Sequence, residues 1–277
     1  MKKILVTTDL STSSRSALRF AIQLASQSGY SLTFFHSYHI LRPTSWSDAS
    51  FVSFENSEST QITQKLRRFV AETYKSMKIP LGEADYVAKN GVYAEREIME
   101  FASKHNYSYI CVSRKGHGKT QKLFGSKIAS LIKRSKVPVI AIPDNYKRTI
   151  ISDITYLSDL SNLDHELKKV TDFSNDVGAK AELLHFKVPI DYLTKAEQLN
   201  AVKDKLNKYN VSAHYETLDY EKTLIQNINK TIDRAKPSLL IMFTHQKRSL
   251  FERIFLSSIS AEFSSMTKIP LLVFDKD

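Results

Sequence analysis

The chain has 277 residues, a formal net charge of +11 and 42% hydrophobic residues, and this length fits two domains better than one. No apolar run approaches the roughly 20 residues that a membrane helix needs, and the N-terminal apolar stretch ends at Thr7, too early for a secretory signal. The single cysteine, Cys111, excludes an internal disulfide framework and a cysteine-built zinc site, so we expect a cytoplasmic protein without a membrane partner.

The charge is concentrated in the first half of the chain. Residues 1–148 contain 23 Lys and Arg against 11 Asp and Glu, a net of +12, whereas residues 149–277 contain 17 against 18, a net of −1. Six of the seven glycines also lie in the first half, and Gly178 is alone in the second. This asymmetry predicts that only the first half binds an anion.

The first half alternates short apolar runs with amphipathic helical patterns. Strands are predicted at 3–8, 31–37, 83–89, 107–113 and 138–143, and helices at 13–29, 61–77, 95–105 and 126–135. Ser11 or Thr12 is expected to cap the first helix and Gly29 to end it, while residues 38–56 carry few structural signals. Strands that alternate with helices predict a mostly parallel sheet with right-handed crossovers.

The second half repeats this order of elements. Its apolar runs at 151–160, 181–188, 238–245 and 268–275 correspond to the first, second, fourth and fifth strands of the first half. Matching residues keep a similar offset, because Asp9 and Asp159 are 150 positions apart and His36 and His185 are 149 apart. We therefore predict a tandem duplication into domains 1–148 and 149–277, which pack against each other as a pseudo-dimer.

A glycine-rich and strongly basic stretch follows the fourth strand. Gly116, Gly118 and Gly125 lie within ten residues of one another, and no acidic residue occurs in 101–143. Glycine lets a phosphate approach the backbone, and the Gly125-Ser126 pair stands where the fourth helix is predicted to begin. The stretch therefore fits a polyphosphate site, and it fits a basic solvated loop equally well.

These motifs resemble those of the universal stress protein family, and the resemblance covers nearly the whole chain as a tandem pair. In that family the first strand ends in P-T-D, and residues 7–9 match this motif with Thr in place of Pro. The family's second strand ends in an L-L-H-type run, which is matched by 34–37 in the first half and by 183–186 in the second. The fourth strand leads into G-x2-G-x9-G-[ST], here 113–126, with Ser113 at the first glycine and a loop one residue shorter. The same serine disfavours a P-loop.

The resemblance implies two tandem α/β domains of the Rossmann-like, adenine nucleotide alpha hydrolase-like class, each a five-stranded, mostly parallel sheet flanked by helices. The fifth strand is the family's usual dimer edge, so a homodimer is also compatible with it. The ligand expected for the first domain is ATP or another adenine nucleotide, with Mg²⁺. Carried over position by position, the implied nucleotide contacts are Thr8, Asp9, Val112, Gly116, Gly125 and Ser126, with no side chain as a metal ligand. Capping the first helix is an equally weighted role for Asp9.

The corresponding loop of the second half contains no glycine. It has a Ser257-Ser258 pair in place of Gly-Ser, and apolar residues such as Phe243 are frequent in and around it. A loop without glycine does not wrap a phosphate easily, so we predict no nucleotide in this half and assign Asp159 to a helix cap.

The predicted function is that of a ligand-responsive stress protein that binds an adenine nucleotide in its first domain only. No Ser/His/Asp set and no paired carboxylates share a strand end, so we do not expect a catalyst. His36 and His185 are assigned structural roles, and Cys111 is expected to be buried and inert. The alternatives are a family member that binds another ligand or acts as an adaptor, a weak ATPase, and, last, a nucleic-acid binder.

Overall fold

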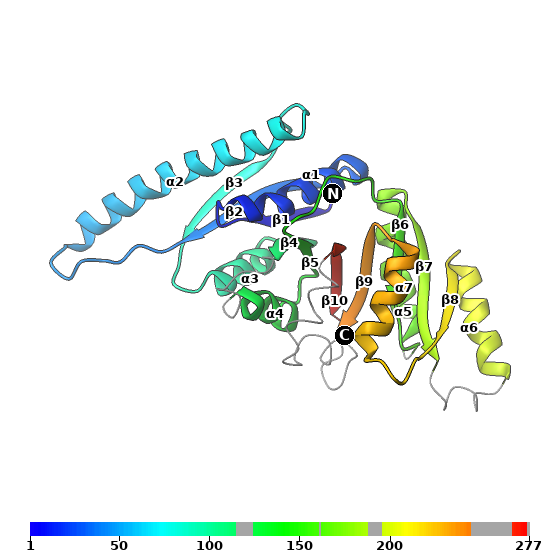
Figure 1. Cartoon of the computed structure of the whole chain (residues 1–277). Coiled ribbons are helices and arrows are strands. Elements are labelled where there is room, and N and C mark those ends of the chain that lie inside the picture. The colour runs from blue at the N-terminus through cyan, green and yellow to red at the C-terminus, as the bar shows by residue number, and fades with distance from the viewer. Residues whose placement is uncertain (115–123, 161, 188–195, 245–267, 276–277) are drawn as a thin grey trace. The chain divides into compact units, whose positions relative to one another are not determined.

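The computed structural model describes residues 1–114, 124–160, 162–187, 196–244 and 268–275 (Figure 1). They form two compact units, Met1–Arg148 and Thr149–Asp277, and each unit has the α/β fold that the sequence predicts. No helix in the described ranges is both long enough and apolar enough to span a bilayer.

The first unit is built on one parallel sheet of five strands. The strands are β1 (Lys3–Thr7), β2 (Ser31–Tyr38), β3 (Asp85–Asn90), β4 (Tyr109–Arg114) and β5 (Val139–Pro143). Their order across the sheet is β3-β2-β1-β4-β5, and each neighbouring pair is parallel. The direction of winding changes between β1 and β4, so their carboxyl ends form the switch point at which open parallel sheets bind ligands.

The helices of the first unit follow the predicted order but not all of the predicted bounds. They are the 3-10 turn η1 (Thr12–Ser14) and the helices α1 (Arg15–Ser28), α2 (Asp48–Ser76), α3 (Ala94–Lys104) and α4 (Phe124–Arg134). Gly29 ends α1 with a φ of 70°, as predicted. The prediction that Ser11 or Thr12 caps α1 is wrong, because η1 intervenes and Ser14 takes the N-cap position.

Helix α2 begins at Asp48 instead of near residue 61. The Ser47 hydroxyl accepts a hydrogen bond from the Ser50 backbone N–H, and the Asp48 carboxylate in the first turn favours the positive end of the helix dipole. The sequence periodicity misses this start because all the buried residues of α2 come from its second half, from Leu66 to Tyr74.

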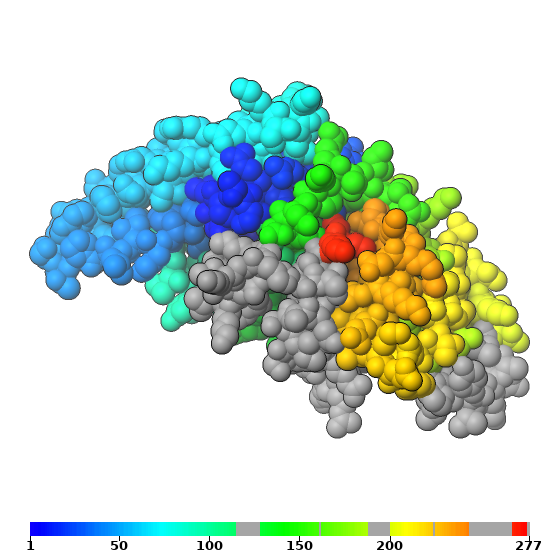
Figure 2. Space-filling model, in the orientation of Figure 1, coloured from blue at the N-terminus to red at the C-terminus, as the bar shows by residue number. Residues whose placement is uncertain are grey.

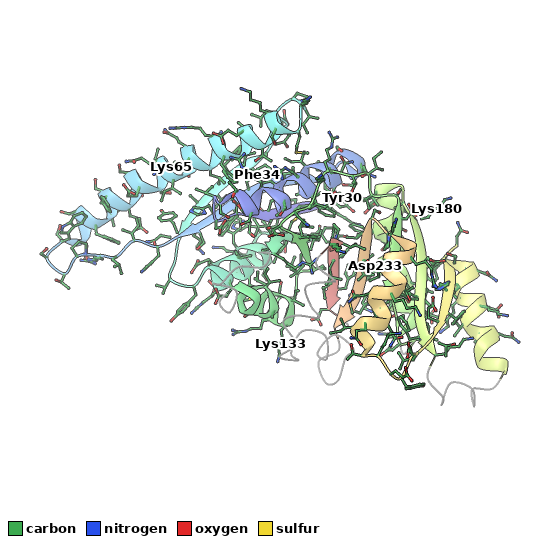
Figure 3. All side chains as sticks on the ribbon, in the orientation of Figure 1. Tyr30, Phe34, Lys65, Lys133, Lys180 and Asp233 are labelled. Carbon is green, nitrogen blue, oxygen red and sulfur yellow. The ribbon has the colours of Figure 1, made fainter. Side chains whose placement is uncertain are left out.

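The core of the first unit lies between the sheet and these helices. Phe34 of β2 is fully buried, and its ring lies 5.8 Å from that of Tyr86 on β3. Lys65 of α2 is exposed on the surface of the helix layer (Figure 3). In an α/β fold the helices cover the faces of the sheet, so sheet side chains are buried and the outer faces of the helices meet solvent.

The second unit repeats the strand order of the first. Its strands are β6 (Asp153–Leu157), β7 (Lys180–Lys187), β8 (Ser212–Thr217), β9 (Leu239–Thr244) and β10 (Leu271–Asp275). They lie in the order β8-β7-β6-β9-β10, all in parallel pairs. The described helices are α5 (Leu163–Val177), α6 (Ala196–Lys208) and α7 (Leu224–Ala235).

The turns after β1 and β6 have the same backbone geometry. Leu10 and Leu160 both adopt positive φ angles, 60° and 62°, which are unfavourable for a side chain of this size. The backbone N–H of Leu10 donates to the Thr8 hydroxyl (3.0 Å), and that of Leu160 donates to the Ser158 hydroxyl (2.9 Å). A shared and strained turn is specific structural support for the duplication.

Two histidines make equivalent contacts with these turns. His36 Nδ1 lies 2.8 Å from the Thr8 carbonyl oxygen, and His185 Nδ1 lies 2.9 Å from the Ser158 carbonyl oxygen. Since a carbonyl only accepts, both imidazoles carry their proton on Nδ1. Each histidine therefore links the second strand of its sheet to the turn that follows the first strand.

Candidate functional site

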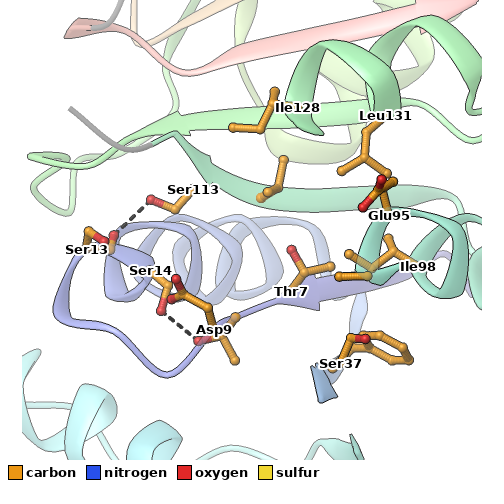
Figure 4. Close-up of a pocket in the computed structure, with 14 residues that line it drawn as sticks. Thr7, Asp9, Ser13, Ser14, Ser37, Glu95, Ile98, Ser113, Ile128 and Leu131 are labelled. Carbon is orange, nitrogen blue, oxygen red and sulfur yellow. Dashed lines mark hydrogen bonds between the residues drawn. The ribbon is translucent and has the colours of Figure 1, made fainter. Parts of the chain in front are cut away.

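A cleft of about 140 Å³ opens at the carboxyl ends of β1, β2 and β4 in the first unit (Figure 4). The strands and the η1 turn contribute Thr7, Thr8, Asp9, Ser13, Ser14, Phe35, Ser37, Val112 and Ser113 to its lining, and helices α3 and α4 contribute Ala94, Glu95, Ile98, Ile128 and Leu131. Three of the predicted nucleotide contacts, Thr8, Asp9 and Val112, thus line a single cleft.

The cleft combines an apolar wall with a polar rim. Its aliphatic side chains come mainly from α3, α4 and β4, including Ile98, Ile128 and Val112. Hydroxyl groups and two carboxylates, Asp9 and Glu95, form the polar rim of the cleft. This chemistry suits a flat ring system that carries hydroxyl groups, because the ring contacts the aliphatic wall while carboxylates accept from the hydroxyls.

Asp9 is exposed and is held by the turn that leads into η1. Its Oδ1 atom accepts hydrogen bonds from the backbone N–H of Ser11 (3.0 Å) and from the Ser11 hydroxyl (2.5 Å). The carboxylate therefore orders the turn that precedes η1, where Ser11 takes the N-cap position, and it does not cap α1 as the alternative predicted. This contact fixes its place at the rim of the cleft.

The hydroxyl of Thr8 is engaged within the protein. It lies 2.7 Å from the Ser14 hydroxyl, and only 7% of Thr8 is exposed. The Ser37 hydroxyl differs, because it is buried, lines the cleft and has no hydrogen-bond partner among the described residues. Ser37 is therefore suited to bond a ligand, and its place at the end of β2 is the only sequence signal for it.

Ser113 joins the end of β4 to the η1 turn. Its hydroxyl lies 2.8 Å from the Ser13 carbonyl oxygen (Figure 4). It also lies 2.6 Å from the Ser16 hydroxyl, which in turn donates to the same carbonyl (2.9 Å). From the sequence, Ser113 is notable only because it stands where the family motif has its first glycine. The structure shows that its side chain ties two sides of the cleft together.

Comparison with known proteins identifies the family. A sequence model of the universal stress protein family matches residues 1–143. The chain belongs to the universal stress protein family. No curated protein sequence matches it.

Solved structures support the tandem arrangement of this universal stress protein. A universal stress protein from Archaeoglobus fulgidus DSM 4304 is 18% identical with a TM-score of 0.67, over 99% of this chain and 98% of the other. A protein from Pseudomonas aeruginosa UCBPP-PA14, proposed to be a universal stress protein, is 13% identical with a TM-score of 0.60. This match covers 99% of this chain and 93% of the other. At these identities the matches show the fold alone.

The remaining predicted contacts, Gly116, Gly125 and Ser126, follow β4 in the sequence. Gly116 is outside the described residues, whereas Gly125 and Ser126 fall in the first turn of α4. The backbone N–H groups of a first helical turn have no intrahelical acceptors, which makes them suitable for an anion. Ile128, about one turn later, lines the cleft, so this end of α4 lies beside it.

Arg114 marks the start of the basic segment. It is only 4% exposed at the end of β4, and burial lowers the pKa of its guanidinium to about 10, an effect that nearby Asp144 opposes. At neutral pH the group is still charged, so it adds a fixed positive charge to this side of the unit.

An aromatic side chain stands at the equivalent strand position of the second unit. The strand registers pair Ile4 with Tyr109 and Ile154 with Leu239, which makes Phe243 the counterpart of Ser113. Phe243 is 8% exposed, and its ring stacks on Phe274 at 5.2 Å. An aromatic ring thus replaces the hydroxyl that lines the first cleft.

A buried carboxylate accompanies this aromatic ring in the second unit. Glu166 is 1% exposed and accepts hydrogen bonds from the hydroxyls of Tyr156 (3.1 Å) and Ser158 (2.5 Å). Burial raises the pKa of Tyr156 well above its usual value, so this phenol remains a donor. Residues 245–267, which include the Ser257-Ser258 pair, lie outside the described residues.

Cys111 is expected to be unreactive in the folded protein. It is fully buried on β4, and burial raises the pKa of its thiol far above neutrality, so almost no thiolate forms. An aromatic disulfide reagent should modify it only as fast as the protein unfolds, and at once in denaturant. Rapid modification of the native protein would contradict the buried placement.

Proposed function

We propose that this universal stress protein binds an adenine nucleotide in the cleft of its first unit and acts as a ligand-responsive binding protein. The observation that carries this proposal is the cleft itself, which lies at the switch point of the sheet and is lined by Thr8, Asp9 and Val112. The adenine ring would contact the aliphatic wall, and the ribose hydroxyls would reach the Asp9 carboxylate and the Ser37 hydroxyl.

The phosphates are expected to extend to the first turn of α4. Gly125 and Ser126 supply backbone N–H groups there, and the basic segment between β4 and α4 supplies positive charge. Mg²⁺ would be bound through phosphate oxygens, because the described residues contain no cluster of three or more His, Cys, Asp and Glu that could hold a metal.

The second unit is proposed as a non-binding partner. Phe243 takes the position of Ser113, and the buried side chain of Glu166 bonds to the Ser158 hydroxyl in the turn after β6. The volume of the aromatic ring opposes a nucleotide at this position.

Titration calorimetry with Mg-ATP tests the proposal. Asp9→Ala removes a ribose acceptor and is expected to weaken binding by about ten-fold, since one charged hydrogen bond contributes about 1.5–3 kcal/mol. Gly125→Val places a branched side chain in the first turn of α4 and should weaken binding at least as much. Asp159→Ala is the matched control in the second unit and should bind as the wild type does.

Two outcomes would remove the nucleotide proposal. One is no heat of binding with the wild type, and the other is an affinity that neither Asp9→Ala nor Gly125→Val changes. Native mass spectrometry of the purified protein would then show whether another small molecule occupies the cleft. Turnover of ATP well above the uncatalysed rate would favour the ATPase alternative.

A further inference from the structure

One carboxylate of the cleft in the first unit has no partner in the part of the chain that the structure describes. Glu95 lines the cleft from the first turn of α3, and it forms neither a hydrogen bond nor an ion pair there. The other acids of this helix are engaged, because Glu97 pairs with Lys89 (2.6 Å) and Glu100 pairs with Arg96 (2.7 Å). Glu95 therefore keeps its full capacity to accept hydrogen bonds from a ligand.

Among the described residues, the hydroxyl of Ser37 is the one other polar side-chain group of the cleft that makes no hydrogen bond. The remaining six polar side chains each make at least one hydrogen bond within the unit, and they are Thr7, Thr8, Asp9, Ser13, Ser14 and Ser113. An unpaired polar group in a closed site costs free energy. A ligand that fills the cleft should therefore bond to Ser37 and to Glu95.

Glu95 lies at the end of the cleft that is farther from Asp9. On α3 it precedes Ile98 by three positions, so the two side chains share a face of the helix. Figure 4 shows both of them toward Leu131 of α4, whereas Asp9 lies on the opposite side. Leu131 is about one turn farther from the start of α4 than Ile128. A ligand whose phosphates reach the first turn of α4 therefore has its other end toward Glu95.

The charge at this end of the cleft restricts what can lie against Glu95. No Lys or Arg is found among the described residues that line the cleft. An ionised carboxylate only accepts hydrogen bonds, and it repels a nearby phosphate. The group that meets Glu95 therefore has to be a donor without negative charge. In an adenine nucleotide the 6-amino group of the base is such a donor, and it lies at the end of the molecule opposite to the phosphates.

We propose that Glu95 selects the base of the nucleotide by accepting a hydrogen bond from the 6-amino group of adenine. This inference rests on the proposed nucleotide site, and it assigns the specificity of that site to one side chain. Guanine and hypoxanthine carry an oxygen at the same position of the ring, and a carboxylate repels that oxygen. The cleft should therefore prefer ATP to GTP and to ITP.

The expected preference is moderate because Glu95 lies near solvent. Its side chain is half-buried, and the preceding residues Val92 and Tyr93 are 65% and 63% exposed. Figure 2 shows the segment that joins β3 to α3, in turquoise, on the surface of the first unit. Water can replace part of a lost hydrogen bond there, so removal of the amino group should weaken binding by about ten-fold.

A nucleotide analogue tests the assignment. Purine riboside triphosphate has hydrogen in place of the 6-amino group and otherwise matches ATP, and titration calorimetry with Mg²⁺ measures the affinity of both. The wild type should bind ATP about ten-fold more tightly than the analogue. Glu95→Ala should bind the two within about two-fold of each other, because only ATP loses a hydrogen bond. Glu95→Gln keeps an acceptor oxygen and should show an intermediate preference.

Two further variants separate base selection from other effects. Glu100→Ala removes an exposed carboxylate from the same helix but outside the cleft, so this variant should keep the wild-type preference. Asp9→Ala should weaken the binding of ATP and of the analogue equally, because the contact proposed for Asp9 is with the ribose.

Failure of this assignment can be told apart from failure of the nucleotide site. A wild type that binds neither nucleotide overturns both. A wild type that binds ATP with the same preference as Glu95→Ala overturns the assignment of Glu95 alone, and so does tighter binding of GTP than of ATP. Tighter binding of both nucleotides to Glu95→Ala would show that the carboxylate only repels phosphate, and it would also overturn the assignment.

Discussion

Ser113→Phe is expected to abolish nucleotide binding and to leave the fold intact. Ser113 lines a cleft of only about 140 Å³, so an aromatic ring at this position would occupy the space that the ligand needs. The change copies the second unit, where Phe243 stands at the equivalent register position. We expect the affinity for Mg-ATP to fall by about 100-fold or more, which corresponds to about 2.7 kcal/mol.

The effect of Ser113→Phe must be separated from a loss of stability. The variant also loses the hydrogen bonds of the Ser113 hydroxyl with Ser13 and Ser16, which should lower the free energy of unfolding by about 1–2 kcal/mol. Ser103→Phe, on the exposed side of α3, is the control and should bind as the wild type does. A Ser113→Phe protein that is folded by circular dichroism and still binds Mg-ATP normally would show that the ligand lies elsewhere.

Phe243→Ala is expected to destabilise the second unit by about 3–5 kcal/mol, the usual cost of truncating a buried phenylalanine. The ring of Phe243 is 8% exposed, stacks on Phe274 and meets Tyr156 edge-on at 6.1 Å, so its removal leaves a cavity beside these two rings. Hydrogen exchange under native conditions measures the change, because the amides of β6 and β9 report on this unit separately from those of β1 and β4.

Tyr220→Ala serves as the control for the second unit. Tyr220 is 64% exposed, so its truncation should change the exchange of β6 and β9 by less than about 0.5 kcal/mol. If Phe243→Ala has an equally small effect, the ring does not fill the unit as the structure indicates. The proposed difference in ligand binding between the two units would then need another explanation.

The sheet could be predicted from the sequence because its strands are continuous apolar runs separated by helical patterns. Residues 3–8 and 31–37 lie within one residue of the ends of β1 and β2, and the duplication gives the same topology in both units. The start of α2 could not be predicted in this way. Its first half is helical without a buried face, so the periodicity that identifies helices is absent there.

The cleft was predictable in outline and not in detail. The rule that ligands bind at the carboxyl ends of parallel strands correctly brings Thr8, Asp9 and Val112 together. Glu95 was not identified, because it belongs to no sequence motif and reaches the cleft through the packing of α3. Ser37 ends the second-strand motif, but the sequence did not assign it a ligand contact, which depends on the pairing of β2 with β1. The correspondence between Phe243 and Ser113 required the strand register, which no sequence pattern specifies.

Hydrogen exchange of the full chain with and without Mg-ATP tests the central claim most directly, since it reports on both units in one experiment. We predict that saturating nucleotide slows the exchange of amides in residues 6–14 and 109–114 of the first unit and leaves residues 156–160 and 239–244 of the second unchanged. Slower exchange in the second unit alone, or no change in either unit, would contradict a nucleotide site confined to the first.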